Sequence, residues 1–317
     1  MSGAGEARKG LLAMAAACCI WGLSSMYYKL LASVPPLEVL SHRTIWSLVF
    51  FGLVLAAQGR LGELGRLLAR PRNLAIVAAA AAMISTNWFF FIYSIQIGRA
   101  VEASLGYYMF PLVAVAMGCL LLGERHSALK WVAVGLACLA VAGLTWGLGA
   151  APWVSLVLAL TFGIYGFVKR GVPAGPVVSV TGEVVLLTPL ALIWLYGVHE
   201  AGWTGLTGRN VATFGHDLSD SLLLILSGPL TATPLILFSY AAKRASYATI
   251  GLVGYINPTL QFLVATFVFR ESFTLWHGFA FGLIWTALAL YSIESLRQDR
   301  AARRAAISAS ISGTTPT

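Results

Sequence analysis

The sequence predicts an all-helical integral membrane protein of ten transmembrane helices, arranged as two inverted five-helix repeats around a central cavity. Three observations predict it: the share of apolar residues, the placement of basic residues, and a recurring order of short motifs. Of the 317 residues, 58% are apolar and 10% are charged, whereas about a quarter of the residues in a soluble domain are charged. Apolar stretches long enough to cross a bilayer follow one another along almost the whole chain.

The first repeat is expected at residues 11–147. Apolar windows of about nineteen residues place its spans at 11–31, 37–57, 74–97, 101–122 and 128–147. Arg8 and Lys9 precede the first apolar stretch as they would in a signal peptide, but that stretch continues to Leu31 with no convincing cleavage site. We therefore interpret it as a retained helix that follows a short cytoplasmic N-terminus, residues 1–10.

The second repeat is expected at residues 152–293. The same windows place its spans at 152–168, 176–197, 219–241, 246–269 and 275–293. The connections between spans are short, which leaves little room for a separate soluble domain. Residues 294–317 are first basic and then rich in Ser and Thr, and are expected to form a disordered cytoplasmic tail.

The basic residues gather on one side of the predicted spans. With a cytoplasmic N-terminus, most of the 21 Lys and Arg residues face the cytoplasm, and the opposite side has only Lys29, Arg99, Arg209 and Arg270. The positive-inside rule then places both termini in the cytoplasm. The net charge of +9 is spread over short clusters rather than one stripe, which argues against nucleic-acid binding. The four cysteines lie in apolar runs without metal-site or disulfide spacing and are expected to be packing residues.

Motifs of the first half recur in the second half. Arg99-Ala100 and residues 103–106 match Arg244-Ala245 and residues 248–251 at an offset of 145, and Trp21-Gly22 lies over Phe162-Gly163 at an offset of 141. After an insertion of two residues, an offset of 147 pairs Tyr108 with Tyr255, Pro111 with Pro258, and Glu124 with Glu271. Because each copy has an odd number of spans, the second copy enters the membrane from the opposite side, and the result is an inverted repeat. That architecture favours a site at the interface between the repeats.

Ionisable residues inside the second and seventh spans are candidates for the mechanism. His42 and Arg43 lie six residues into the second span, about 9 Å along the helix. A charge at that depth is costly unless it is paired or hydrated, so an intramembrane Arg indicates a functional site. Glu183 overlies His42 at the offset of 141. His42, Arg43 and Glu183 could therefore form one cluster that binds substrate or couples transport to protons. The alternatives are a static ion pair, or an Arg43 side chain that extends to the outer interface.

Polar residues in the third, fourth and ninth spans could line a cavity. Asn87 and Trp88 interrupt an Ala-rich third span, and either face the cavity or form interhelical hydrogen bonds. The matching fourth and ninth spans carry five further candidates beside prolines that could kink both helices. These five are Tyr107, Tyr108, Tyr255, Asn257 and Gln261.

Residues near the ends of spans have structural interpretations. Glu102 is expected to pair with Arg99 at the outer interface, and Glu124 and Glu271 are expected to cap loops at opposite faces. Gly278 and Gly282 give the last helix a small-residue face. That face could pack within the chain, the preferred interpretation, or pair two protomers in a homodimer.

Several of these segments resemble the EamA-type ten-span members of the drug/metabolite transporter (DMT) superfamily, and within them the RarD-like proteins. The similar segments, in order from about residue 8 to 296, are Ile20-Trp21-Gly22, the Ser-His-Arg-Thr-Ile-Trp of 41–46, Asn87-Trp88, residues 102–107, residues 123–125 and Tyr255-Ile256-Asn257-Pro258. One departure is Met109-Phe110-Pro111, where an Asn is expected before the proline, so an Asn role carries over only to Asn257.

The resemblance implies a permease of the bacterial cytoplasmic membrane with a central cavity and no nucleotide cofactor, and it favours export as the direction of transport. A secondary transporter of a small metabolite or drug-like molecule, working by alternating access and with proton coupling as one option, is therefore the favoured function. The alternative is a channel, scramblase or sensor on the same fold. An enzyme is disfavoured because no His-x-x-x-His, Asp-rich or Gly-x-Ser-x-Gly pattern occurs in a credible setting, and no metal site is predicted.

Overall fold

The structure, a computed structural model, describes residues 3–122, 127–205, 208, 213–244 and 247–312. These residues form helices joined by turns and loops and contain no strand, which confirms the all-helical prediction. Among them, nine helices are long and apolar enough to cross a membrane, and the remaining predicted span is the shorter apolar helix Trp153–Lys169. Glu124 and Arg209 lie outside the described residues.

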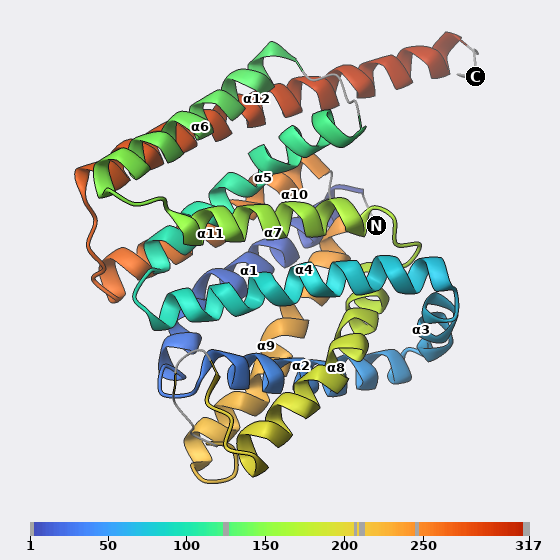
Figure 1. Cartoon of the computed structure of the whole chain (residues 1–317). Coiled ribbons are helices and arrows are strands. Elements are labelled where there is room, and N and C mark those ends of the chain that lie inside the picture. The colour runs from blue at the N-terminus through green and yellow to red at the C-terminus, as the bar shows by residue number, and fades with distance from the viewer. Residues whose placement is uncertain (1–2, 123–126, 206–207, 209–212, 245–246, 313–317) are drawn as a thin grey trace.

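The helices follow the predicted spans in order (Figure 1). The elements of the first half are α1 (Gly3–Leu30), α2 (Pro36–Ala57), the short α3 (Leu61–Leu68), α4 (Pro71–Gln96), α5 (Ala100–Leu122) and α6 (Ala128–Leu148). Those of the second half are α7 (Trp153–Lys169), α8 (Pro176–Glu200), α9 (Leu218–Ala242), α10 (Tyr247–Gly254), α11 (Ile256–Leu263), a π-helical segment η2 (Val264–Val268) and α12 (Leu275–Ser312). Proline begins α2, α4 and α8, where its fixed φ suits a helix and its missing N–H breaks no helical bond.

The ninth predicted span is broken, whereas the fourth is one continuous helix. Pro258 has no N–H to donate to the carbonyl of Gly254, four residues earlier, and the chain breaks between α10 and α11 next to that carbonyl. Pro111 lies inside α5, which remains a single helix. The two matching prolines therefore coincide with different local structures.

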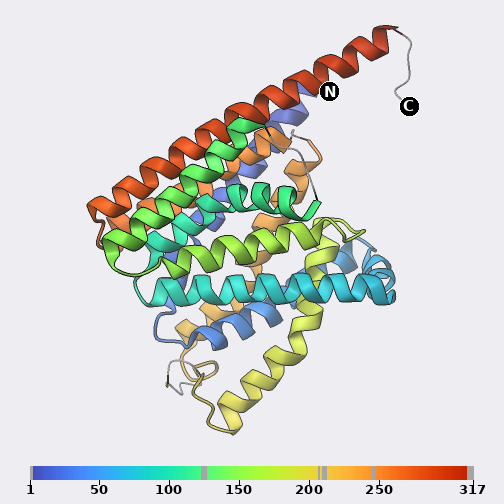
Figure 2. The ribbon, with the colours of Figure 1, turned by 45° about the horizontal axis from the view of Figure 1, so that its top comes forward.

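The last helix continues beyond its predicted end at residue 293. α12 runs to Ser312, so the described part of the predicted disordered tail is helical. The segment after Glu294 is rich in Ala and Arg, which have high helix propensity. α12 lies alongside α6, and the two form an outer layer beside the other helices (Figures 1 and 2).

The packing between α6 and α12 uses glycines of α6 rather than those of α12. Gly143 and Gly147 leave space that is filled by the rings of Phe279 and Trp276. A Cβ built on Gly282 meets nothing within 4 Å, so this glycine packs against no other described helix. The preferred interpretation of the Gly278 and Gly282 face, packing within the chain, therefore does not hold at Gly282, whose face is open.

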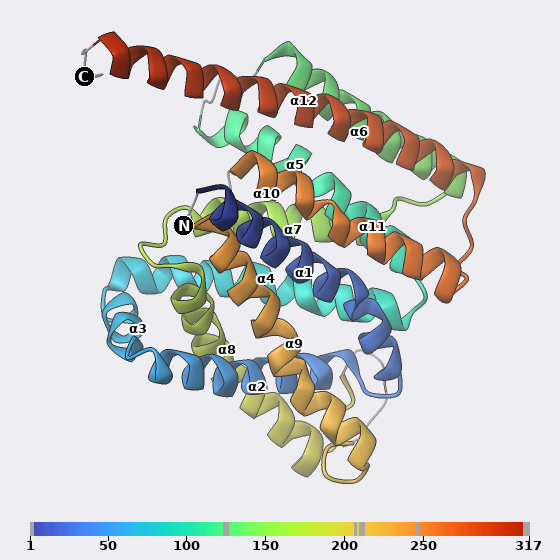
Figure 3. The ribbon, with the colours of Figure 1, turned by 180° about the vertical axis from the view of Figure 1, so that it is seen from behind.

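The inner helices pair across the two halves of the chain. α1 packs along α9 and α11, α7 packs along α4 and α5, and α2 lies against α8 and α9, as the reverse view shows for α1 and α9 (Figure 3). Two of these crossings depend on glycine. A Cβ on Gly22 would lie 2.6 Å from the Cβ of Leu260, and a Cβ on Gly163 would lie 2.6 Å from Cγ1 of Val113. The backbones approach closely there because neither glycine has a side chain.

The start of α5 is held by a residue of the second half. The carboxylate of Glu271 accepts hydrogen bonds of 2.8 Å each from the backbone N–H groups of Ala100 and Val101. These are among the first N–H groups of the helix, which have no partner within it. Glu271 is thus a cap, as predicted. The predicted ion pair of Arg99 and Glu102 is also present, with 3.3 Å between Nε of Arg99 and Oε1 of Glu102.

Candidate functional site

Arg43 is buried between four helices and surrounded by aromatic rings. Its guanidinium carbon lies 4.0 Å from the centroid of the Trp88 ring and 5.7 Å from that of Tyr28. Its Nε donates a 2.8 Å hydrogen bond to Oγ1 of Thr231. These partners come from α4, α1 and α9, while Arg43 itself is on α2. The side chain is 7% exposed and is directed into the protein, which contradicts the alternative that it extends to the outer interface.

No described carboxylate forms an ion pair with Arg43. The attraction of the rings and one hydroxyl stabilises the charge only in part, because a buried guanidinium is usually compensated by an anion. A guanidinium with free N–H groups is well suited to grip a carboxylate or phosphate through two parallel hydrogen bonds. The surroundings of Arg43 therefore match the binding site of an anionic group.

Aromatic rings continue from Arg43 toward α7. The Tyr28 ring meets Phe91 edge-on with centroids 5.9 Å apart, Phe91 meets Tyr107 at 5.7 Å, and Tyr107 meets Phe162 at 5.8 Å. Edge-to-face contacts of this kind are the favoured geometry of aromatic pairs. The rings join α1, α4, α5 and α7 into one wall beside the guanidinium.

Asn87 uses its amide to connect three helices. Its Nδ2 donates to the carbonyl of Leu158 at 3.0 Å and to Oγ1 of Thr161 at 2.9 Å, and its Oδ1 accepts a 2.9 Å bond from the hydroxyl of Tyr107. Both amide hydrogens are thereby used. This arrangement corresponds to the interhelical alternative, while the neighbouring Trp88 faces Arg43.

Glu183 is paired with Lys169 and not with His42 or Arg43. Its carboxylate forms an ion pair with Nζ of Lys169 and accepts a 3.2 Å hydrogen bond from the hydroxyl of Tyr165. Lys169 also donates to Oγ of Ser179 at 2.6 Å. The predicted cluster of His42, Arg43 and Glu183 is therefore not formed in this structure. The physical reason is the short connection between α7 and α8. It brings the end of α7 beside the first turns of α8, so that Nζ of Lys169 lies next to the Glu183 carboxylate.

His42 faces a different direction from its neighbour Arg43. Successive residues of a helix are rotated by about 100°, so adjacent side chains point to different faces. The His42 ring stacks on Phe214, with centroids 4.5 Å apart and planes at 27°. Its ligand atoms lie close to those of Glu38 and His199. Glu38 was not among the predicted site residues, although its position four residues before His42 places both on one helix face.

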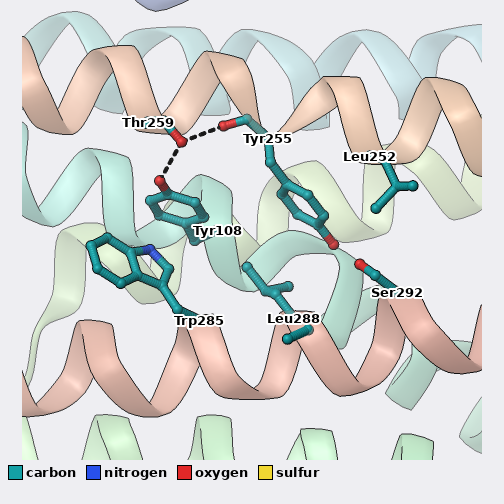
Figure 4. A pocket seen from close by; sticks show the side chains of 8 residues that line it. Tyr108, Leu252, Tyr255, Thr259, Trp285, Leu288 and Ser292 are labelled. Carbon is teal, nitrogen blue, oxygen red and sulfur yellow. Dashed lines mark hydrogen bonds between the residues drawn. The ribbon is translucent and has the colours of Figure 1, made fainter.

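Two further predicted residues, Tyr108 and Tyr255, line a pocket of about 410 Å³. They line it together with Thr259 and Trp285, between α5, α10, α11 and α12 (Figure 4). The hydroxyl groups of Tyr108 and Thr259 are hydrogen bonded at 2.6 Å.

Asn257 and Gln261 do not line this pocket. They bond to each other along α11, with Nε2 of Gln261 donating to Oδ1 of Asn257 at 2.9 Å. The ten predicted residues thus fall into separate groups rather than one cavity.

Comparison with known proteins gives consistent similarities. Residues 8–146 match the EamA-like transporter family. The chain is 39% identical to an uncharacterized transporter of Pseudomonas aeruginosa, across 92% of this chain and 96% of the relative. It is 40% identical to the protein RarD of Streptomyces exfoliatus, across 96% and 94%. An uncharacterized transporter of Bacillus subtilis is 37% identical across 94% and 98%.

One solved crystal structure resembles the fold. It superposes with a TM-score of 0.57 at 19% identity and covers 89% of this chain and 96% of the solved chain. At that identity the similarity concerns the arrangement of the helices alone.

Proposed function

We propose, from the premise that this chain belongs to the EamA-like transporter family and to its RarD-like members in the drug/metabolite transporter superfamily, that it exports a small anionic metabolite or drug-like molecule. Transport proceeds by alternating access as a secondary-active process across the bacterial inner membrane, with both termini in the cytoplasm. Membership of a transporter family and the many apolar helices support a transport function over an enzymatic one.

The observation that carries the proposed substrate class is the environment of Arg43. Its guanidinium lies deep in the protein with no described carboxylate to pair with, against the faces of Trp88 and Tyr28. An anionic group supplied by the substrate would compensate the buried charge, and an apolar or aromatic part of the same molecule would stack on the rings. The expected substrate is therefore an aromatic or amphipathic carboxylate of amino-acid size.

The proposed inverted repeat is supported by the pattern of helix packing. In a duplicated five-span protein, α1 corresponds to α7, α4 to α9, and α5 to the span formed by α10, α11 and η2. The contact of α1 with α9 then has its counterpart in that of α7 with α4, and the contact of α1 with α11 has its counterpart in that of α7 with α5. α2 with α8, and α6 with α12, each pair with their own equivalents.

The two glycine crossings support the same correspondence at the level of residues. Gly22 and Gly163 are equivalent at the offset of 141, and their partners Leu260 and Val113 are equivalent at the offset of 147. A pair of equivalent crossings supports the proposed duplication, with the second copy inverted relative to the first. An inverted repeat of this kind favours alternating access about a site near the middle of the membrane.

Ligand-dependent thermal stabilisation of the purified protein tests the proposal. A molecule that binds the folded protein raises its apparent stability by mass action. We would use a library of amino acids, aromatic acids and antibiotics, and then measure uptake of any hit into proteoliposomes. Arg43→Ala is expected to abolish the stabilisation by an anionic hit, while Arg72→Ala, at an exposed position, keeps it.

The outcomes separate the possible functions. Saturable uptake that depends on a gradient supports a transporter, and non-saturable flux identifies a channel. Stabilisation by anions that is unchanged in a folded Arg43→Ala protein would overturn the proposed role of Arg43.

A further inference from the structure

Three potential metal ligands meet at the predicted outer end of the protein, apart from the surroundings of Arg43. Glu38 and His42 are one helical turn apart on α2, and His199 is in the last turn of α8. One ligand atom of each residue lies within 4.8 Å of those of the other two. Glu38 and His42 are buried, whereas His199 is exposed.

Each of the two buried residues has one polar atom without a hydrogen-bond partner. These atoms are Oε2 of Glu38 and Nε2 of His42, in residues that are 0% and 5% exposed. The other carboxylate oxygen of Glu38 accepts a 3.1 Å bond from the backbone N–H of Thr213. A buried polar atom without a partner is unusual and costly, so the two atoms require a ligand that neither helix provides.

The rest of the site holds the buried ligands in place. The stacked Phe214 ring restricts the His42 imidazole, and the bond from Thr213 fixes one side of the Glu38 carboxylate. Both contacts come from the segment that precedes α9. Contacts that orient a ligand in this way are what a metal site needs around its coordinating atoms.

We propose that Glu38, His42 and His199 bind one divalent transition-metal ion of intermediate softness, for which Zn²⁺ is the representative. Two imidazole nitrogens and one carboxylate oxygen are a common ligand set for this ion, with a water molecule at the fourth position. Metal–ligand bonds of about 2.0–2.2 Å require the ligand atoms to approach to about 3.4 Å of one another. His199 provides this movement, because it is exposed and lies at the end of its helix.

The bound ion would join helices from the two halves of the chain. α2 belongs to the first half and α8 to the second, and the site lies at the end of α8 that is predicted to face outward. A metal bridge there restrains the separation of the two helices. The proposal does not depend on transport, because it rests on the coordination chemistry of these three residues.

Direct metal binding tests the site. Full-length protein, purified without a polyhistidine tag and treated with a chelator, would be titrated with ZnCl₂ by calorimetry, and the bound metal would be counted by elemental analysis. We expect one Zn²⁺ per chain and an increase in melting temperature. Co²⁺ in its place is expected to give the visible absorption of a four-coordinate site.

The key variant is His199→Ala, because an exposed side chain can be removed without disturbing the core. It is expected to weaken Zn²⁺ binding by at least about tenfold, since even the loss of a residue that only supports a ligand costs that much. His42→Ala is expected to have a larger effect. His216→Ala is the matched control, as this exposed histidine is nearby in sequence and outside the site.

Absence of stoichiometric binding, or equal affinity in wild type and a folded His199→Ala protein, would overturn the proposal. Either result would leave the role proposed for Arg43 unaffected, because the ligand screen there is performed without metal.

Discussion

The guanidinium of Arg43 lies over the face of the Trp88 ring, with 4.0 Å between the guanidinium carbon and the ring centroid. The contact joins α2 to α4 inside the protein. It stabilises a buried cation by the negative face of an aromatic ring, and it leaves the N–H groups at the edge of the guanidinium for a ligand.

Replacing the Trp88 ring tests two roles, stabilisation of the buried Arg43 cation and stacking on an aromatic ligand. Trp88→Leu is expected to lower the free energy of unfolding by roughly 1–2 kcal/mol, because the cation loses its ring. It should also weaken binding of an aromatic anion, whereas Trp88→Phe retains a large part of both effects. Denaturant titration in detergent and the thermal-shift assay measure these changes. Equal affinity in the Leu and Phe variants would contradict a stacking role.

The ion pair of Lys169 and Glu183 should respond unequally to the loss of either partner. Glu183 is fully buried, while the Lys169 side chain is 21% exposed and can turn toward water. Lys169→Met should therefore cost about 3–5 kcal/mol, as expected when a buried charge loses its partner, and Glu183→Gln should cost less. The double variant Lys169→Met/Glu183→Leu is expected to regain much of the loss.

The same variants test proton coupling. If Glu183 is a coupling acid, transport by Glu183→Gln at normal expression should be lost or become independent of the proton gradient. Full transport with unchanged pH dependence in this variant would show that the role of Glu183 is structural.

The close approach at Gly163 should not tolerate a methyl group. Gly163→Ala is expected to destabilise the protein by about 1–3 kcal/mol, because the new Cβ would overlap Val113. Val113→Ala should relieve the overlap in the double variant. Gly135→Ala, where a Cβ meets nothing within 4 Å, is the control and is expected to be neutral. A tolerated Gly163→Ala would contradict the close crossing of α5 and α7.

Loss of the Glu271 cap should weaken the start of α5. Glu271→Ala leaves the N–H groups of Ala100 and Val101 without acceptors, and the expected cost is about 1–2 kcal/mol. Glu200→Ala, which removes an exposed carboxylate near the same predicted face, is expected to change the melting temperature little. Thermal unfolding of the two variants in the same detergent gives the comparison.

The sequence predicted the positions of residues along the helices better than their direction around a helix. Apolar length located the helices, and the positions of Glu271 and Arg99 near their ends gave the cap and the ion pair that the structure contains. Rotation about a helix axis depends on the packing of neighbours, which one sequence does not reveal. His42 and Arg43 were for that reason predicted to act together, although they face different surroundings.

The sequence did not predict Lys169 as the partner of Glu183 or Glu38 as a neighbour of His42, and both omissions have a tertiary cause. Long side chains choose among groups on other helices, so the pairing of Glu183 with Lys169 depended on a tertiary contact. Glu38 was overlooked because it lies near a predicted helix end, where a carboxylate is ordinarily hydrated. Its burial results from the segment before α9, which covers it. The spacing of Glu38 and His42 was the available signal.

The ninth span consists of two helical segments, α10 and α11, which meet at Tyr255. The pocket in Figure 4 extends across this joint, with Leu252 contributed by α10 and Thr259 by α11. α11 is held against α1 at the close approach of Gly22 and Leu260, so a bend at Tyr255 would displace α10 relative to α11. A hinge at this point would change the width of the pocket mouth with little disturbance of the rest of the bundle.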